Sequence, residues 1–144
     1  MTWDNGYKAF FKLHRLVIDK KFGSIPYARK IRNWIYSKSS SSGTPVMVDL
    51  PRHRLFVNPA DKGVGRNILF NGAYEPTETQ LFELVLRPGM RFVDVGAHVG
   101  YYTTLGAKLV GSEGEVVAIE PAPANNALLR KNIEVNNLTQ RSRT

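Results

Sequence analysis

Hydrophobic and polar positions along the chain predict a succession of short strands and helices. The apolar runs at 92–95 and 115–119 predict two strands, the first suited to burial on both faces of a parallel sheet. Residues 102–110 between them carry apolar side chains at helical spacing and predict a helix. A strand–helix–strand order packs as a parallel crossover in nearly all known cases, so the pattern predicts an α/β fold.

Further elements are expected on both sides of this unit. Residues 46–50 and 53–57 predict two strands, and 127–138 predict a helix that stops at Asn136-Asn137. Residues 77–86 predict another helix. Its expected apolar side consists of Leu81, Phe82, Val85 and Leu86.

The turn between the first central strand and its helix contains Gly96-x-x-x-Gly100, with Asp94 two residues before the first glycine. Backbone N–H groups and the helix dipole at such a turn favour an anionic ligand group. A nicotinamide or flavin site requires G-x-G-x-x-G at this place, and the spacing here does not meet that fingerprint. The turn therefore predicts a site for another small molecule.

Glu120 directly follows the second central strand. The crossover places this residue at the carboxyl end of the neighbouring strand, beside the glycine turn. It lies 20 residues after Gly100, the offset at which an acidic side chain accepts hydrogen bonds from both ribose hydroxyls. Two such bonds are charge-assisted and worth about 1.5 to 3 kcal/mol each.

Three segments together resemble the FkbM family of S-adenosylmethionine-dependent methyltransferases. They are F-V-D-V-G-A-H-V-G-Y-Y-T at 92–103, A-I-E-P-A-P at 118–123 and L-L-R-K-N-I-E-V-N-N-L at 128–138. The segments A-Y-E-P-T-E-T at 73–79 and L-R-P-G-M at 86–90 resemble the lead-in to this motif. The resemblance implies a Rossmann-like fold, S-adenosylmethionine as cofactor, and methyl transfer, usually to an oxygen, on a small molecule or sugar.

The resemblance also implies a set of cofactor-binding residues. These are Glu75, Asp94, Gly96, Ala97, His98, Gly100, Tyr101, Glu120 and Pro121. Asp94 either positions the Gly96 turn and the methionine amino group or only caps the turn. Glu75 either faces the cofactor or acceptor, or is a carboxylate favoured near a helix N-terminus. His98 has a pKa suited to a general base, but we interpret it as a loop residue that packs over the cofactor.

No catalytic residue is assigned. Methyl transfer is an in-line displacement, so the enzyme holds acceptor oxygen and methyl carbon in line and removes a proton where needed. Residues for those tasks are expected beyond Leu138, whereas the sequence ends at Thr144 with only the first two strands of the parallel core placed. We expect a truncated or frameshifted member that carries the cofactor half. The alternative is a catalytically inactive fragment that binds cofactor or pairs with another chain.

Positive charge is concentrated at the start of the chain. Residues 1–38 contain nine Lys/Arg and two Asp, so they hold +7 of the net charge of +8. Their apolar periodicity predicts two short amphipathic helices, interrupted near 23–26. Such helices either contact an anionic membrane surface or nucleic acid, or cap the next domain with their charged face in water.

Three sections are expected along the chain. The basic helical extension 1–38 is followed by a Ser-rich linker at 39–44 and then by the N-terminal part of a methyltransferase domain at 45–144. Within that part, the resemblance implies a small β-rich segment at 45–72 and a cofactor-binding half at 73–138.

Composition excludes several other classes. With 144 residues, 42% of them hydrophobic, one folded domain is expected. The absence of cysteine excludes disulfides and thiolate metal sites, and His53 has no second ligand at metal spacing, so we interpret it as a solvated strand residue. No apolar run approaches the roughly 18 residues of a membrane span, no signal-peptide core begins the chain, and no nucleic-acid-reading motif occurs. A cytoplasmic location is expected, with weak contact to anionic membranes at most; the oligomeric state is open.

Overall fold

The computed structural model describes residues 43–139 and 142–144. The predicted basic helices of residues 1–38, and residues 39–42 of the predicted linker, lie outside the described residues. No helix in the described part of the chain is long and apolar enough to cross a membrane.

The chain divides into two compact units. Among the described residues, unit 1 holds 43–48 and 57–73, and unit 2 holds 49–56 and the chain from Tyr74 onward. All predicted cofactor-binding residues belong to unit 2.

Unit 1 contains a helix that the sequence did not predict, α3 (Val64–Asn71). The Asp61 carboxylate accepts hydrogen bonds from the N–H groups of Gly63 and Gly65 and so organises the helix start. Gly72, with φ of 65°, ends α3 in the left-handed conformation and donates its N–H to Ile68 O at 2.9 Å. Gly72 of the Asn71-Gly72 pair therefore caps the C-terminal end of α3. The segment predicted to be β-rich at 45–72 thus contains the helix α3 in addition to two strands.

The two predicted strands that precede α3 are confirmed. Strands β1 (Val46–Asp49) and β2 (Arg54–Val57) form a two-stranded sheet. The turn between them is closed by the N–H of Leu50, which donates to the carbonyl oxygen of His53 at 2.9 Å. This turn and the first three residues of β2 belong to unit 2.

The centre of unit 2 is a parallel sheet in the order β3-β4-β5. β3 (Arg91–Val95) and β4 (Glu115–Ile119) pair over their whole length, and α5 (Tyr101–Val110) forms the crossover between them. The predicted strand–helix–strand unit is thus confirmed. A third strand, β5 (Ser142–Arg143), pairs with β4 and corrects the expectation of two strands. It was missed because backbone pairing, rather than an apolar run, defines it.

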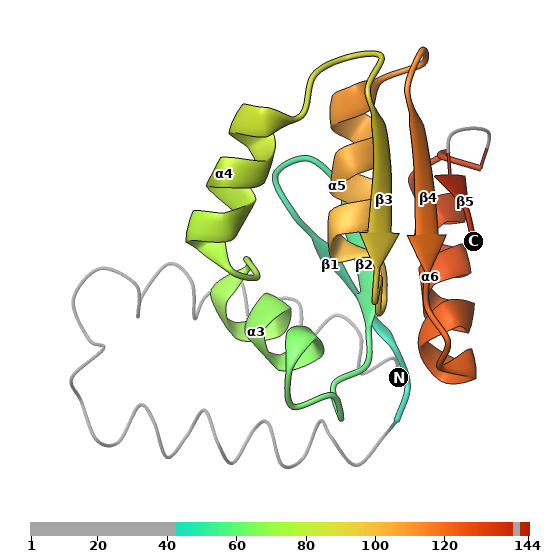
Figure 1. Cartoon of the computed structure of the whole chain (residues 1–144). Coiled ribbons are helices and arrows are strands. Elements are labelled where there is room, and N and C mark those ends of the chain that lie inside the picture. Colours follow the sequence, from blue (N-terminus) through green and yellow to red (C-terminus); the bar gives the residue numbers. More distant parts are fainter. Residues whose placement is uncertain (1–42, 140–141) are drawn as a thin grey trace, which may run out of the picture. The chain divides into compact units, whose positions relative to one another are not determined.

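Among the described residues, the core cluster covers one face of the sheet. Val116 and Ala118 of β4 are 0% and 3% exposed and belong to a core cluster with residues of α5 and α6 (Pro123–Val135), the two helices behind the strands in Figure 1. On the other face Val93 and Val95 are 55% and 77% exposed. The prediction that the first central strand is buried on both faces is therefore wrong. The helix predicted to begin at residue 127 begins at Pro123, where the missing proline N–H costs nothing.

The predicted helix ahead of the sheet is α4 (Pro76–Val85). Phe82 packs its ring against Phe92 and Tyr102, with centroid distances of 5.0 and 5.1 Å. Leu81 and Val85, expected on the same apolar side, are instead exposed to solvent. The periodicity thus predicted the helix correctly, but fewer of its apolar side chains pack against the rest of the unit than predicted.

Candidate functional site

The turn that joins β3 to α5 uses its two glycines for different reasons. Gly96 and Gly100 have φ of 80° and 88°, a region that other residues rarely adopt. At Gly100 an added Cβ would also lie 2.5 Å from Cδ1 of Leu129, whereas nothing lies within 4 Å of a Cβ at Gly96. Gly100 therefore permits close packing of α6 on the turn, and Gly96 leaves space open above it.

The turn is fastened to the end of β4. The N–H groups of Gly96 and Ala97 both donate to the carbonyl oxygen of Ile119, at 2.9 and 3.1 Å. This arrangement follows from the sheet register, in which Val95 pairs with Ile119. The carboxyl ends of the two strands thus meet, as the sequence predicted for parallel neighbours.

Glu120 lies at this junction, and its side chain is hydrogen-bonded to the turn. Its Oε2 accepts the N–H of His98 at 2.8 Å, and its Oε1 accepts the N–H of Ala122 at 2.9 Å. Partial burial acts to raise the pKa of Glu120, but these N–H groups outweigh it and leave the pKa below its ordinary value. The side chain is therefore an oriented carboxylate at neutral pH. The Asn125 side chain also hydrogen-bonds this carboxylate. The two oxygens together have about four lone-pair directions, so beside these three donors the carboxylate can accept one further hydrogen bond.

Asp94 points toward the first turn of α5. Its Oδ2 accepts the hydroxyl of Thr103, and the Thr103 N–H also hydrogen-bonds this carboxylate. Burial raises the pKa of Asp94 and the Glu120 charge adds to that shift, whereas the Thr103 bonds act to lower it. The contacts match the turn-capping role that the sequence left open as one of two alternatives.

His98 has φ of 52° and is half-buried, so the turn holds a non-glycine residue in the left-handed region. Such conformations persist where the surroundings enforce them, here through the bond from the His98 N–H to Glu120. Ala97 beside it is buried, and Pro121, after Glu120, is exposed.

Glu75 joins this region through the start of α5. It precedes α4 with φ of 45°, and its Oε2 accepts the hydroxyl of Tyr102 at 3.0 Å. Burial and the Glu75 carboxylate raise the pKa of Tyr102 to about 12, so its hydroxyl stays a donor. Tyr101 is buried, and its hydroxyl lies 3.2 Å from Oγ1 of Thr79. The two tyrosines fix the start of α5 against the chain around Glu75.

His53 requires a correction, because it is buried rather than solvated, with only 5% of its surface exposed. Its ring packs edge-on against Tyr101 at 5.2 Å between centroids, and its Nδ1 lies 3.4 Å from Oγ1 of Thr104. Burial, with the nearby charge of Lys108, lowers the pKa of His53 to about 4. The hairpin turn thus packs on α5, which an alternating strand pattern did not reveal.

Sequence reasoning also missed two buried asparagines of this unit. Asn132 in α6 and Asn136 at its C-terminal end are 0% and 6% exposed. Their spacing of four residues, beside the apolar Leu129 and Ile133, was the available signal, since it places polar groups on the buried face of a helix.

Comparison with known proteins relates much of unit 2 to methyltransferases. The family model of protein-L-isoaspartate(D-aspartate) O-methyltransferase matches residues 74–142. Protein-L-isoaspartate O-methyltransferase 1 of Arabidopsis thaliana is 47% identical over 55 residues, which are 38% of this chain and 24% of the relative. Ribosomal RNA large subunit methyltransferase E of Acinetobacter baumannii is 36% identical over 96 residues, 67% of this chain and 41% of the relative. The chain therefore spans less than half the length of these relatives.

Among solved structures, TYW2 of M. jannaschii in complex with AdoMet aligns with a TM-score of 0.55 and 22% identity. The alignment covers 69% of this chain and 41% of that chain. At this identity the likeness shows the fold. The matched relatives are protein and RNA methyltransferases, and they support the methyltransferase class without singling out the FkbM family. The chain has the Rossmann-like fold of the S-adenosylmethionine-dependent methyltransferases, and the comparisons support S-adenosylmethionine as its cofactor.

Proposed function

We propose that unit 2 binds S-adenosylmethionine at the junction of β3 and β4 and that the protein serves methyl transfer from it. The observation that carries this proposal is the Glu120 carboxylate, held at both oxygens by the N–H groups of His98 and Ala122 beside the glycine turn. Beside its bonds from His98, Ala122 and Asn125, the carboxylate keeps the capacity to accept a ribose hydroxyl. Bound S-adenosylmethionine would supply a methyl group activated by its sulfonium.

The other residues of the turn receive roles that follow from their places. The open space at Gly96 admits the cofactor close to the backbone, and His98 packs over it. Asp94 keeps the start of α5 in place through Thr103 and is proposed to approach the methionine amino group. Pro121 contributes exposed apolar surface next to the ribose site.

Three further residues complete the proposed site. Ala97 allows the turn to pack on the core, since it is buried and leaves its N–H directed to Ile119. Glu75 and Tyr101 flank the start of α5, Glu75 through the Tyr102 hydroxyl and Tyr101 through its own contact with Thr79. We propose that Glu75 faces the amino acid end of the cofactor or the acceptor. No catalytic base is assigned.

For the methyl acceptor we propose an oxygen of a small molecule or sugar, as the FkbM resemblance implies. A second candidate is a protein carboxyl group, which the match of residues 74–142 to the isoaspartate O-methyltransferase model favours. RNA is the acceptor class of the relative from Acinetobacter baumannii. Transfer of labelled methyl from S-adenosylmethionine to an isoaspartyl peptide, to ribosomal RNA and to a mixture of sugars separates these candidates.

Calorimetric titration of S-adenosylmethionine into the 144-residue protein tests the cofactor site. The Glu120→Ala variant is expected to bind at least about tenfold more weakly, since it loses the charge-assisted bond to the ribose. Glu134→Ala, which removes an exposed carboxylate from α6, serves as the matched control and should leave affinity unchanged. A folded wild-type chain that gives no heat, or equal binding by both variants, would contradict the proposal. Binding without transfer to any acceptor would favour the inactive alternative.

A further inference from the structure

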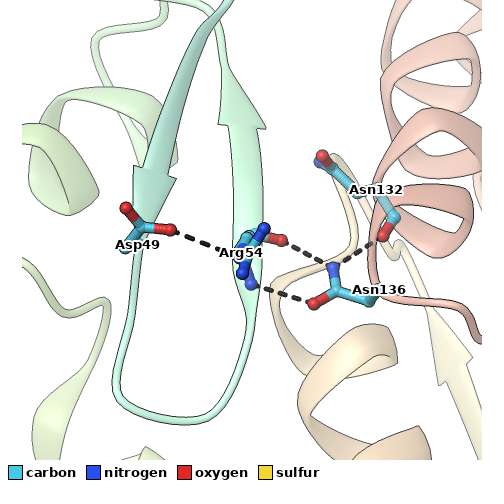
Figure 2. Close-up of polar contacts among 4 residues, drawn as sticks. All are labelled: Asp49, Arg54, Asn132 and Asn136. Carbon is cyan, nitrogen blue, oxygen red and sulfur yellow. Dashed lines mark hydrogen bonds and ion pairs between the residues drawn. The ribbon is translucent and has the colours of Figure 1, made fainter.

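Two asparagines of α6 and its C-terminal end hold the backbone of β2. The Asn136 side chain accepts the N–H of Arg54 at 2.9 Å and donates to the Arg54 carbonyl oxygen at 2.7 Å (Figure 2). The Asn132 side chain bonds Phe56 in the same way: it accepts the Phe56 N–H at 2.6 Å and donates to the Phe56 carbonyl oxygen at 3.0 Å. We call these four bonds the asparagine clasp.

The clasp works because two spacings agree. Residues four apart on a helix are separated by about 6 Å along its axis, and residues two apart on a strand by about 6.6 Å. Asn132 and Asn136 therefore meet alternate residues of β2. Each amide exchanges two hydrogen bonds with one residue, as a neighbouring strand does in an antiparallel ladder. The helix thus supplies β2 with the partners that a strand would otherwise provide.

Asn132 alone of the two also reaches the cofactor turn. Its Nδ2 donates a second hydrogen bond to the carbonyl oxygen of Val99 at 2.8 Å. The second hydrogen of the Asn136 amide instead goes to the main-chain oxygen of Asn132, within the same segment. Asn132 is fully buried, so both its N–H groups are committed in a place where water cannot replace them.

The Val99 carbonyl belongs to the peptide group that opens α5. The N–H of the same peptide, on Gly100, donates to Ala97 O at 2.8 Å. The N–H of His98, two residues earlier in the turn, is held by Glu120. The turn is therefore fixed from two sides, by Glu120 from the end of β4 and by Asn132 from α6.

We propose that Asn132 is a positioning residue for the cofactor turn, through which docking of the hairpin at Arg54–Phe56 sets the geometry of Gly96–Gly100. The statement that this geometry serves S-adenosylmethionine rests on the proposed function. That Asn132 orders the turn is independent of the proposed function. The two parts can therefore be tested separately on the same variants.

The test compares Asn132→Ala with Asn136→Ala in the 144-residue protein. Both remove half of the clasp, so amide hydrogen exchange, followed by NMR, should accelerate at Phe56 in the first variant and at Arg54 in the second. Exchange at the Gly100 amide should accelerate in Asn132→Ala only. In calorimetry, that variant should bind S-adenosylmethionine about tenfold more weakly, whereas Asn136→Ala should stay within about twofold of the wild type.

Asn132→Leu is the second variant in case Asn132→Ala does not fold, because it keeps nearly the same volume in this buried place while removing both donors and the acceptor. Unchanged Gly100 exchange in a folded Asn132 variant would overturn the positioning role. Equal effects of the Asn132 and Asn136 variants on Gly100 exchange would also overturn it, since general loosening would then explain them. If the wild type binds no S-adenosylmethionine, the proposed function fails and the Gly100 exchange still decides this inference.

Discussion

The two faces of the sheet in unit 2 are built from the same strands and differ in what covers them. On one face Val116 is fully buried under α5 and α6, and the hairpin turn packs on α5 through His53. On the other face Val93, Val95 and Ile119 are each at least half exposed. Apolar side chains occur on both faces of the strands. Apolar character thus predicts a strand, whereas the burial of each face depends on where the connecting helix packs.

The largest expected difference between the two faces comes from deleting side chains. Leu129→Ala removes a fully buried side chain on the covered side and should lower the free energy of unfolding by about 2 to 5 kcal/mol. Val93→Ala on the open face should cost less than about 1 kcal/mol. Urea denaturation measures both values. Similar losses for the two variants would mean that the open face is buried in solution.

The next effect is a pH dependence that belongs to the covered side. The pKa of His53 is about 4 in the folded protein against 6.5 in the unfolded chain, so the unfolded chain binds more protons between these values. Stability should therefore fall as the pH drops through 6.5 and level off below about 4. The difference of 2.5 pKa units corresponds to about 3 kcal/mol at most.

His53→Phe is the control for this effect, since it keeps a ring against Tyr101 and cannot titrate. The raised pKa of Asp94 acts in the opposite sense and is common to both proteins, so the difference between their unfolding free energies isolates His53. Urea denaturation from pH 7 to pH 4 provides the measurement. Parallel pH profiles of the two proteins would show that His53 is accessible to protons in the folded state.

A smaller effect is expected from the two glycines of the cofactor turn. Gly100→Ala should cost about 2 kcal/mol or more, since it adds a clash with Leu129 to the strain of a positive φ. Gly96→Ala adds only the strain of a positive φ and should lower the free energy of unfolding by about 1 kcal/mol. It should nevertheless weaken cofactor binding more than Gly100→Ala does.

A double-mutant cycle identifies the cause of the Gly100 effect. In a Leu129→Ala background, Gly100→Ala should lose the contribution of the clash and keep only that of the backbone. Thermal unfolding of the four proteins measures the coupling. Additive costs would contradict the close contact between Gly100 and Leu129.

The parts of the site that could be predicted are those that local chain geometry dictates. A strand–helix–strand segment has one favoured way to pack, so Glu120 was expected beside the glycine turn, and its bond to the His98 N–H is consistent with that place. The helices at α4 and α5 followed from periodicity and from the proline and glycines that bound them. No distant contact was needed for either inference.

The parts that could not be predicted depend on residues far apart in sequence. His53 is buried by contact with α5, and Asn132 and Asn136 bond to β2. The sequence near each residue contains no sign of these contacts and indicates only a histidine in a strand and the end of a helix. In the same way the apolar residues of α3, which lead to Asn71-Gly72, did not by themselves predict a helix. The left-handed Gly72 satisfies a helix end as well as a strand turn, and the tertiary environment decides between them.

The asparagine clasp also has a consequence for the order of events during synthesis. Its bonds join residues that are 76 and 82 positions apart, and a ribosome adding about 5 to 20 residues per second needs about 4 to 16 s to make that length. The hairpin is therefore complete well before its helical partner exists. Through this interval the backbone groups of Arg54 and Phe56 lack their asparagine partners, and unpaired strand groups of this kind are open to pairing with other chains.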